Sequence, residues 1–339
     1  MSIHTHRVFI ALATILVAIF STQASAEQRS LCLFDPVGER GDMYAMLKDF
    51  RVTVKDLGVD LELKPFDSES VIVNEFKAGK CDSIAVTGMK VRPFNQFTAT
   101  IEAVGALPAY EDVHLLMKTM TNPGLQDKLV QGEYEVAGVL PVGNVYTFLK
   151  RKKWATQGLQ DHLQGKKVSV FEGDNVSYEM VRNMGANPVV VTTTSFSGMF
   201  NNGAVDITFA PAVAYEPMEL YKGLANNGGI IRTPLIQLTF QMVIRHKRFP
   251  EGFGQKLREI SYRYMGFALQ YVHMVEKKIP ERHWVELPMR EVAGLTSIMR
   301  QTRMRLRDRD IYDGDMLNMM RKIRCQRDPS HFECIQKLE

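Results

Sequence analysis

The sequence predicts an α/β protein of two lobes, each a mainly parallel sheet flanked by helices, followed by a helical C-terminal region. Two observations predict the lobes: strand and helix patterns alternate twice along the chain, and one short motif recurs at the same place in both units. After Pro250 the chain becomes almost wholly helical. Without the first 26 residues, 339 − 26 = 313 residues remain, more than one hydrophobic core usually holds.

The first unit alternates strand and helix. An apolar run stopped by Asp35-Pro36 is typical of a buried strand entering a loop. The next stretch repeats apolar residues at helical spacing and ends at Gly58. Asp67 or Ser68 can cap a second helix. We expect strands at 30–34, 59–63 and 83–87 and helices at 43–57 and 68–79, an order that produces parallel strands with helices on both faces.

The same order returns in the middle of the chain. A helix starting near Asn175 carries apolar residues on one face and stops at Gly185. Pro211 closes the last strand of the unit. The expected strands are 167–171, 188–192 and 205–209, and the expected helices are 175–185 and 195–202.

A shared motif relates the two units. Phe76-x-x-Gly79-x-x-Asp82 in the first has the spacing of Phe200-x-x-Gly203-x-x-Asp206 in the second. The phenylalanine is expected to anchor a helix to the sheet, the glycine to end that helix in a left-handed conformation, and the aspartate to start the next strand. Recurrence in register favours two similar lobes.

Two long segments are expected to cross between the lobes. Residues 134–150 are rich in Val, Tyr and Phe, and a second crossing falls near 230–245. Three helices follow, at 253–278, 289–306 and 315–325. The expected division is a signal peptide at 1–26, lobe 1 at 27–139, lobe 2 at 140–232, and a return strand with C-terminal helices packing on lobe 1 and the hinge at 233–339.

The N-terminus predicts export. His4, His6 and Arg7 form a basic start, residues 8–20 are apolar, and Ala24-Ser25-Ala26 is a cleavage site, the order of a secretory signal peptide. The apolar run is shorter than the roughly 20 residues that span a bilayer. The mature chain is therefore expected to begin near Glu27 and to work in a periplasm. Its net charge falls from +4 to +3 when Arg7 is lost, which gives no indication of a nucleic-acid partner.

Four cysteines remain in the mature chain. Cys325 and Cys334 bracket a short loop, and we expect a disulfide that holds the end of the chain. The alternative, a metal site with His331, has too few ligands. Cys32 and Cys81 lie in two predicted strands that can be neighbours, and whether they pair stays open because buried free cysteines are common.

Residues of the second unit resemble a known family. Gly165-Lys166-Lys167-Val168, Met184-Gly185-Ala186-Asn187-Pro188 and Phe200-Asn201-Asn202-Gly203-Ala204-Val205-Asp206 look like the second-lobe pattern of the solute-binding proteins of TRAP-type transporters (DctP-like). The chain is most similar to a divergent AdeT-type group of these proteins. The resemblance implies a two-lobed periplasmic-binding-protein fold of type II and capture of a solute for a membrane transporter.

One position departs from the family pattern. The family has an arginine that pairs with the ligand's carboxylate at the end of the "GKK" strand, where this chain has Ser169. A serine lacks the charged fork of arginine. Either another arginine takes this role, with Arg40 and Arg92 near predicted loop ends, or the ligand is not a simple carboxylate.

Ligands of open parallel sheets bind outside the carboxyl ends of the strands, so the site is expected in the cleft between the lobes. Each choice has a plainer alternative: a strand-end phenylalanine belongs more often to a core, Asp174 or Asn175 can cap a helix, and the run from Thr192 to Ser195 can bind an anion or cap a helix. The candidate ligand-binding residues are Phe34, Asp35, Thr87, Arg92, Tyr146, Ser169, Phe171, Glu172, Asn175, Thr194 and Phe209.

No catalytic pattern supports an enzyme. Ser197 lacks the flanking glycine of a nucleophile elbow, and the histidines show no paired metal-ligand spacing. No cofactor is expected. The main interpretation is a monomeric periplasmic protein that captures a small polar or organic solute by hinge closure and delivers it to membrane transporter subunits. The alternative is an exported accessory protein of an envelope or efflux complex on the same scaffold.

Overall fold

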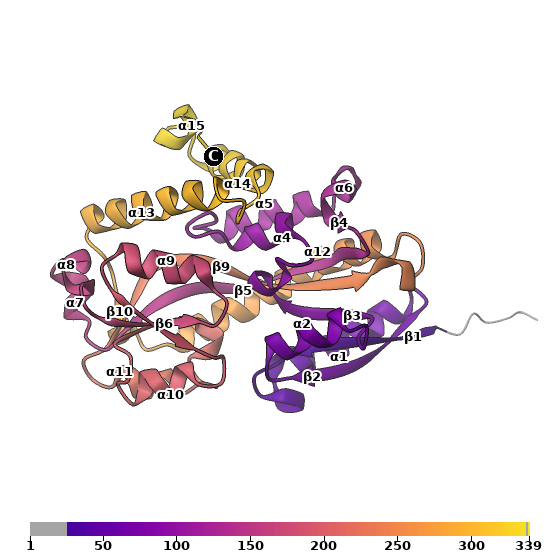
Figure 1. Cartoon of the computed structure of the whole chain (residues 1–339), viewed down its shortest axis with the longest axis horizontal. Helices are drawn as coiled ribbons and strands as arrows, with labels where there is room; N and C mark the ends of the chain where they lie inside the picture. Colours follow the sequence, from indigo (N-terminus) through magenta and orange to yellow (C-terminus); the bar gives the residue numbers. More distant parts are fainter. Residues whose placement is uncertain (1–25, 337) are drawn as a thin grey trace, which may run out of the picture.

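The computed structural model describes residues 26–336 and 338–339 (Figure 1). The predicted signal peptide lies almost wholly outside the described residues. Among them, ten strands form one continuous hydrogen-bonded sheet that is shared by two lobes, with the order β2-β1-β3-β9-β5-β8-β6-β7. Short strands β4 (Val130–Gln131) and β10 (Trp284–Val285) pair with β5 and β9. The predicted two-lobed α/β class is confirmed.

Lobe 1 contains β1 (Glu27–Phe34), β2 (Val59–Phe66) and β3 (Ser83–Thr87), which pair in parallel. Along β1, Leu31 and Leu33 face one core and Cys32 faces the other. The first core holds α1 (Asp42–Lys55), whose buried face is Leu47, Phe50 and Val54. The second holds α2 (Glu69–Lys77), α4 (Gln96–Ala99) and α5 (Tyr110–Met120).

Lobe 2 repeats this arrangement with β6 (Lys167–Phe171), β7 (Asn187–Val191) and β8 (Ile207–Pro211). β6 pairs in parallel with both of the others. Helix α9 (Asn175–Asn183) covers one face together with α8 (Leu159–Leu163), and α10 (Phe196–Asn201) and α11 (Leu220–Leu224) cover the other. A short α7 (Lys153–Thr156) precedes α8.

Two long antiparallel strands, β5 (Tyr134–Leu149) and β9 (Gly229–Arg245), run through both lobes. Figure 1 shows them as the central ribbon that joins the two halves. Their register shifts between Pro141 and Gly143 and again between Val145 and Thr147. Irregular pairing weakens a ladder locally, so this stretch is the natural place for the lobes to bend relative to each other. Both crossings were predicted from the sequence.

The motif shared by the two units has the predicted roles. Phe76 and Phe200 are fully buried, and Gly79 and Gly203 have φ of 77° and 78°, the left-handed region that favours glycine. The aspartates make an additional bond that the sequence did not reveal. Asp82 accepts from the main-chain N–H of Ser30 at 2.8 Å, and Asp206 accepts from that of Lys167 at 3.0 Å. Each aspartate therefore binds the main chain of a neighbouring strand, at Ser30 within β1 and at Lys167 at the start of β6.

The C-terminal helices cover the lobes and the hinge. α12 (Phe253–Lys278) packs along β5, and α13 (Met289–Arg307) runs past α9 of lobe 2 (Figure 1). α14 (Gly314–Arg327) packs on α5. The segment between β3 and β5, for which the sequence predicted no elements, forms α3 (Gly88–Val91), α4, α5 and α6 (Gln126–Leu129).

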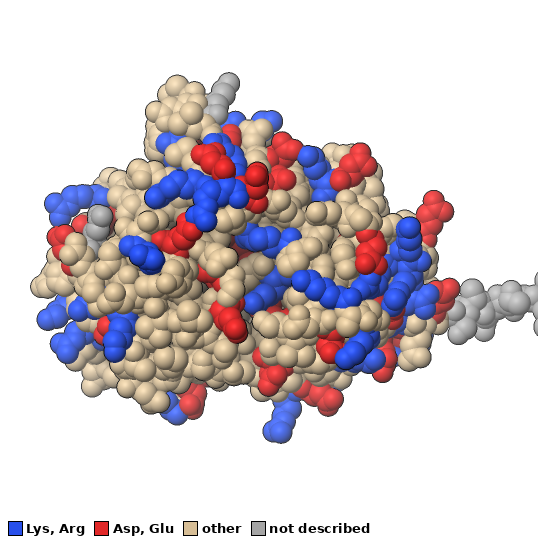
Figure 2. Space-filling view, in the orientation of Figure 1, with Lys and Arg blue, Asp and Glu red and all other residues tan. Residues whose placement is uncertain are grey.

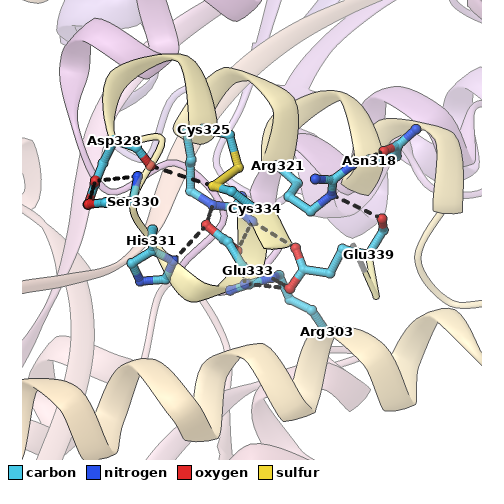
Figure 3. Close-up of a disulfide and its surroundings, with 11 residues drawn as sticks. Arg303, Asn318, Arg321, Cys325, Asp328, Ser330, His331, Glu333, Cys334 and Glu339 are labelled. Carbon is cyan, nitrogen blue, oxygen red and sulfur yellow. Dashed lines mark hydrogen bonds and ion pairs between the residues drawn. A yellow bond between two sulfur atoms is a disulfide. The ribbon is translucent and has the colours of Figure 1, made fainter. Parts of the chain in front are cut away.

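The structure contains two disulfides. Cys325 of α14 is bonded to Cys334 of α15 (Phe332–Gln336), as predicted (Figure 3). Beside it, Arg324 donates to both carboxylate oxygens of Glu333 at 2.7 Å and to Glu339 at 2.8 Å. Cys32 and Cys81 are also paired, which answers the question that the sequence left open. This bond ties β1 to the residues before β3.

Candidate ligand site between the lobes

The strands of both lobes end along the middle of the crossing pair. Thr87, the last residue of β3, is opposite Phe240 of β9, and Pro211, the last residue of β8, is opposite Val145 of β5. The loops after these strands therefore meet between the lobes. Figure 2 shows basic side chains gathered in the middle of this face, where the lobes join.

Two polar contacts reach across the junction. Lys90 of α3 donates to the main-chain oxygen of Glu172 at 3.3 Å, and its ammonium is 3.5 Å from the hydroxyl of Ser70. Arg309, which follows α13, forms an ion pair with Glu179 of α9. The side chain of Glu172 is exposed, so the candidate residue Glu172 takes part in the first contact through its backbone alone.

Two buried carboxylates fix the turn after β3. The candidate Thr87 donates its N–H and its hydroxyl to Glu69, at 2.6 and 2.8 Å. Glu102 accepts from the N–H groups of Gly88 at 2.9 Å and Met89 at 2.7 Å, and from the N–H of Thr239 on β9 at 2.7 Å. Burial raises the pKa of Glu102 to about 7, and the hydrogen bonds oppose that shift. The turn is thereby tied to the hinge strand.

The other lobe 1 candidates have structural partners. Asp35 is buried, and its two oxygens accept from the N–H groups of Val37 at 2.9 Å and Tyr44 at 3.0 Å, so it caps the start of α1. Phe34 packs against the cores on both faces of the sheet. Arg92 donates to the main-chain oxygen of Ile311, and its guanidinium lies 5.4 Å from the ring centre of Tyr312.

The two candidate phenylalanines of lobe 2 pack against different cores, on opposite faces of the sheet. Phe171 packs edge-on against Phe196, with ring centres 5.3 Å apart. Phe209 packs with the core on the other face of the sheet and lines an apolar cavity of about 30 Å³. The hydroxyl of Ser169 is 2.6 Å from that of Thr208, and both residues are buried. The hydroxyl that replaces the family's arginine is therefore already paired.

Polar side chains in the loops after β6 and β7 form hydrogen bonds within their own loop or with the helix that follows it. Asp174 caps α9 by accepting from the N–H of Ser177 at 3.0 Å, while Asn175 is exposed at the first position of that helix. The hydroxyl of the exposed Thr194 is 3.0 Å from that of Thr192. Burial raises the pKa of Tyr312, the charge of Arg92 lowers it, and the charge of Asp174 raises it.

A polar cluster lies on the hinge around the candidate Tyr146. Its hydroxyl donates to Glu276 of α12 at 2.6 Å, and Tyr110 of α5 donates to the same oxygen at 2.6 Å. Asn144 donates its N–H to the Tyr110 hydroxyl at 3.3 Å. His273 lies 3.5 Å from the other oxygen of Glu276. The sequence indicated only Tyr146, because the other members come from helices distant in sequence.

Residues 51–339 match the family model described as "Solute-binding protein AdeT 1/2". The chain belongs to this family. It is 36% identical over 302 residues to the probable solute-binding protein AdeT1 of Acinetobacter baumannii, covering 89% of this chain and 98% of that protein. It is 25% identical to AdeT2 of the same organism over 231 residues, covering 68% of this chain and 96% of that protein.

Solved structures of low sequence identity share the fold. A TRAP periplasmic solute-binding protein from Desulfovibrio salexigens, with bound orotic acid, has a TM-score of 0.70 and 12% identity, covering 88% of this chain and 97% of that one. DctP7 of Bordetella pertussis, an extracytoplasmic solute receptor that binds pyroglutamic acid, has a TM-score of 0.69 and 13% identity, covering 88% and 100%. The resemblance predicted from the sequence is confirmed.

These findings make the chain a solute-binding protein and favour solute capture over the accessory-protein alternative. In the part of the chain that the structure describes, no helix is long and apolar enough to cross a membrane. Over the same residues, no three His, Cys, Asp or Glu side chains are grouped so that they can hold a metal ion.

Proposed function

We propose that the protein captures a small organic solute between its two lobes in the periplasm and delivers it, as a monomer, to a membrane transporter. In this proposal lobe 1 comprises residues 27–139, lobe 2 comprises residues 140–232, and the remaining chain returns across lobe 1 and the hinge. Capture involves no covalent chemistry and no cofactor.

The observation that carries the proposal is the meeting of the two sets of strand ends along the crossing strands. Ligands of α/β sheets bind at such ends, and a solute held there contacts both lobes. Contacts to both lobes stabilise the closed arrangement over the open one, which is how hinge closure depends on a ligand. The contact of Lys90 in lobe 1 with the Glu172 backbone in lobe 2 supports the proposal, because it joins the two lobes directly.

Proteins of the same fold indicate the general class of the solute. Proteins of this fold are described with bound orotic acid and with pyroglutamic acid, both small organic molecules that carry a carboxylate and ring N–H groups. Position 169 is a serine whose hydroxyl is paired with that of Thr208, so this position cannot supply the arginine contact to a carboxylate that the family pattern implies. We therefore propose a small organic solute without assigning it a carboxylate.

A thermal-shift screen tests the proposal. The mature protein from Glu27 is heated with carboxylates, amino acids, amines and sugars, each at several concentrations. A captured solute raises Tm progressively, since ligand at about 100 times Kd stabilises the folded state by about 2.7 kcal/mol. Recovery of the compound unchanged after incubation distinguishes binding from turnover. The proposal is wrong if no class of compound raises Tm.

A further inference from the structure

Two buried amide side chains are paired across the hinge. Asn144 of β5 is directly opposite Gln237 of β9, so their side chains lie on the same face of the strand pair. Asn144 is 6% exposed and Gln237 is 1% exposed. Neither Asn144 Oδ1 nor Gln237 Oε1 has a hydrogen-bond partner among the described residues. An unpaired buried acceptor is costly, and because these two lie opposite each other on adjacent strands, one donor group of a bound molecule can satisfy both.

The contacts of the two amide nitrogens identify the atom of each side chain that has no hydrogen-bond partner. Gln237 Nε2 donates to the main-chain oxygen of Leu238 at 3.2 Å, and Asn144 Nδ2 lies 3.5 Å from the hydroxyl of Tyr146. Tyr146 gives its own hydrogen to Glu276, so its oxygen can only accept from Asn144. Turning either amide over places two acceptors against each other. The free atoms are therefore the two carbonyl oxygens, and both require a hydrogen-bond donor.

Asn144 is connected to the Glu276 carboxylate through the hydroxyls of Tyr110 and Tyr146. Glu276 accepts from Tyr110 and Tyr146, and no lysine or arginine in the described parts of the chain pairs with it; His273 lies 3.5 Å from its other oxygen. Burial and the Glu276 carboxylate raise the pKa of both tyrosines, which keeps them neutral donors at physiological pH. We name Tyr110, Asn144, Tyr146, Gln237 and Glu276 the hinge cluster. It offers two free acceptors and one carboxylate to a partner.

The hinge cluster lies on the crossing strands next to the point where the last strand of lobe 2 ends. Gln237 follows Ile236, the partner of Val145, and Val145 is opposite the last residue of β8. The register shifts of β5 and β9 lie on either side of the Asn144–Gln237 pair. A molecule bound to both oxygens therefore joins the two crossing strands at the point where the lobes separate. It resists bending there and stabilises one arrangement of the lobes.

We propose that the hinge cluster recognises the solute through an ammonium or primary amide group that donates to Asn144 Oδ1 and Gln237 Oε1. The inference rests on the proposed function and narrows its solute class. Such a nitrogen carries two or three hydrogens, enough to bridge two acceptors. A carboxylate has none to donate and is repelled by Glu276. The absence of arginine at Ser169 is consistent with the same preference.

Matched probes test the chemical class. Putrescine, succinamide and succinate share a four-carbon skeleton, and 1,6-diaminohexane, adipamide and adipate share a six-carbon skeleton. We expect the diamine or the diamide of a set to raise Tm and the dicarboxylate to leave it unchanged. A larger shift with succinate or adipate, or no shift with any of the six, overturns the inference. Binding of another compound in the wider screen then leaves solute capture itself standing.

A variant separates recognition from structure. Gln237→Met keeps the length of the side chain and removes the unpaired oxygen. We expect it to weaken binding of the amine or amide probe at least tenfold, while Tm of the free protein stays the same or rises because no buried acceptor is left unpaired. Gln157→Met, at an exposed position, is the matched control and should change neither quantity. Unchanged affinity in Gln237→Met overturns the inference, as does a loss of stability without a loss of affinity.

Discussion

Lys150 and Arg245 occupy matching positions at the ends of the two crossing strands. The Lys150 ammonium lies 4.8 Å from the ring centre of Phe200, and the Arg245 guanidinium lies 5.0 Å from that of Phe76. Their main-chain N–H groups donate to the main-chain oxygens of Asp206 and Asp82, both at 3.0 Å. Each lobe thus ends one crossing strand with a cation over its motif phenylalanine. The two lobes are therefore similar: β5 ends beside the motif of lobe 2 in the way that β9 ends beside the motif of lobe 1.

Because the two lobes are similar, substitution of either motif glycine should lower the free energy of unfolding by the same amount. Gly79→Ala and Gly203→Ala should each destabilise the protein by about 1–2 kcal/mol, because alanine is strained at the positive φ that both adopt. Gly266→Ala, at an exposed and unobstructed position inside α12, should instead stabilise by about 0.5–1 kcal/mol. Urea denaturation measures all three. A difference between the two motif variants of more than about 1 kcal/mol contradicts the equivalence.

Acid sensitivity should come in part from Asp82. Its pKa is lowered: burial alone would raise it, but hydrogen bonds from Ser30 and Arg248 outweigh that effect. The bonds therefore stabilise the fold above the ordinary pKa of the carboxyl and are lost as pH falls through the lowered one. Asp82→Asn should cost about 1–2 kcal/mol at pH 7 and less at pH 3, which lies below the ordinary pKa of 3.8. Asp127→Asn, at an exposed site, should show no such difference. Urea titrations at both pH values measure it.

The two disulfides should differ in accessibility. Cys32 and Cys81 are each 1% exposed, whereas Cys325 and Cys334 are half-buried beside the end of the chain. Mild reduction of the native protein followed by alkylation and peptide mass spectrometry should therefore label Cys325 and Cys334 first. Equal labelling of all four contradicts the structure. Loop-closure entropy predicts a loss of about 2–3 kcal/mol without the Cys325–Cys334 bond and about 4 kcal/mol without Cys32–Cys81.

The sequence predicted the fold better than the site. Strand and helix periodicity, together with the Phe-x-x-Gly-x-x-Asp repeat, predicted the six lobe strands, both crossings and the long C-terminal helices, with bounds within a few residues. Periodicity failed between Gly88 and Gln131, where most helices are four residues long. Such short helices are held by tertiary contacts, for example those of Glu102 with the turn at Gly88 and Met89, and these leave no local pattern.

Site residues were harder to predict because polar residues at strand ends can either contact a ligand or cap the helix that follows. Asp35 and Asp174 both follow strand ends, where ligand contacts are expected, and in the structure each caps a helix. Glu69, Glu102, Tyr110 and Glu276 gave no signal, since their partners are distant in sequence. Whether the eleven candidate residues contact a solute stays a prediction.

Lys90 should contribute to closure. Lys90→Met removes the donor that reaches the Glu172 backbone while keeping a similar side-chain volume. We expect Tm of the ligand-free protein to change little, because this is one half-exposed contact, and the affinity for a solute found in the screen to fall about three- to tenfold. Lys118→Met on an exposed face of α5 is the control. Unaltered affinity would mean that this contact does not stabilise the closed form.

Ligand-dependent closure is the central claim, and a distance between the lobes tests it most directly. Val71 of α2 and Val190 of β7 are 44% and 58% exposed, one in each lobe, and the four native cysteines are paired. Spin labels on a Val71→Cys, Val190→Cys variant therefore report the separation of the lobes by pulsed electron paramagnetic resonance. The account predicts a shorter and narrower distance distribution when a solute from the screen saturates the protein. An identical distribution with and without saturating solute contradicts it.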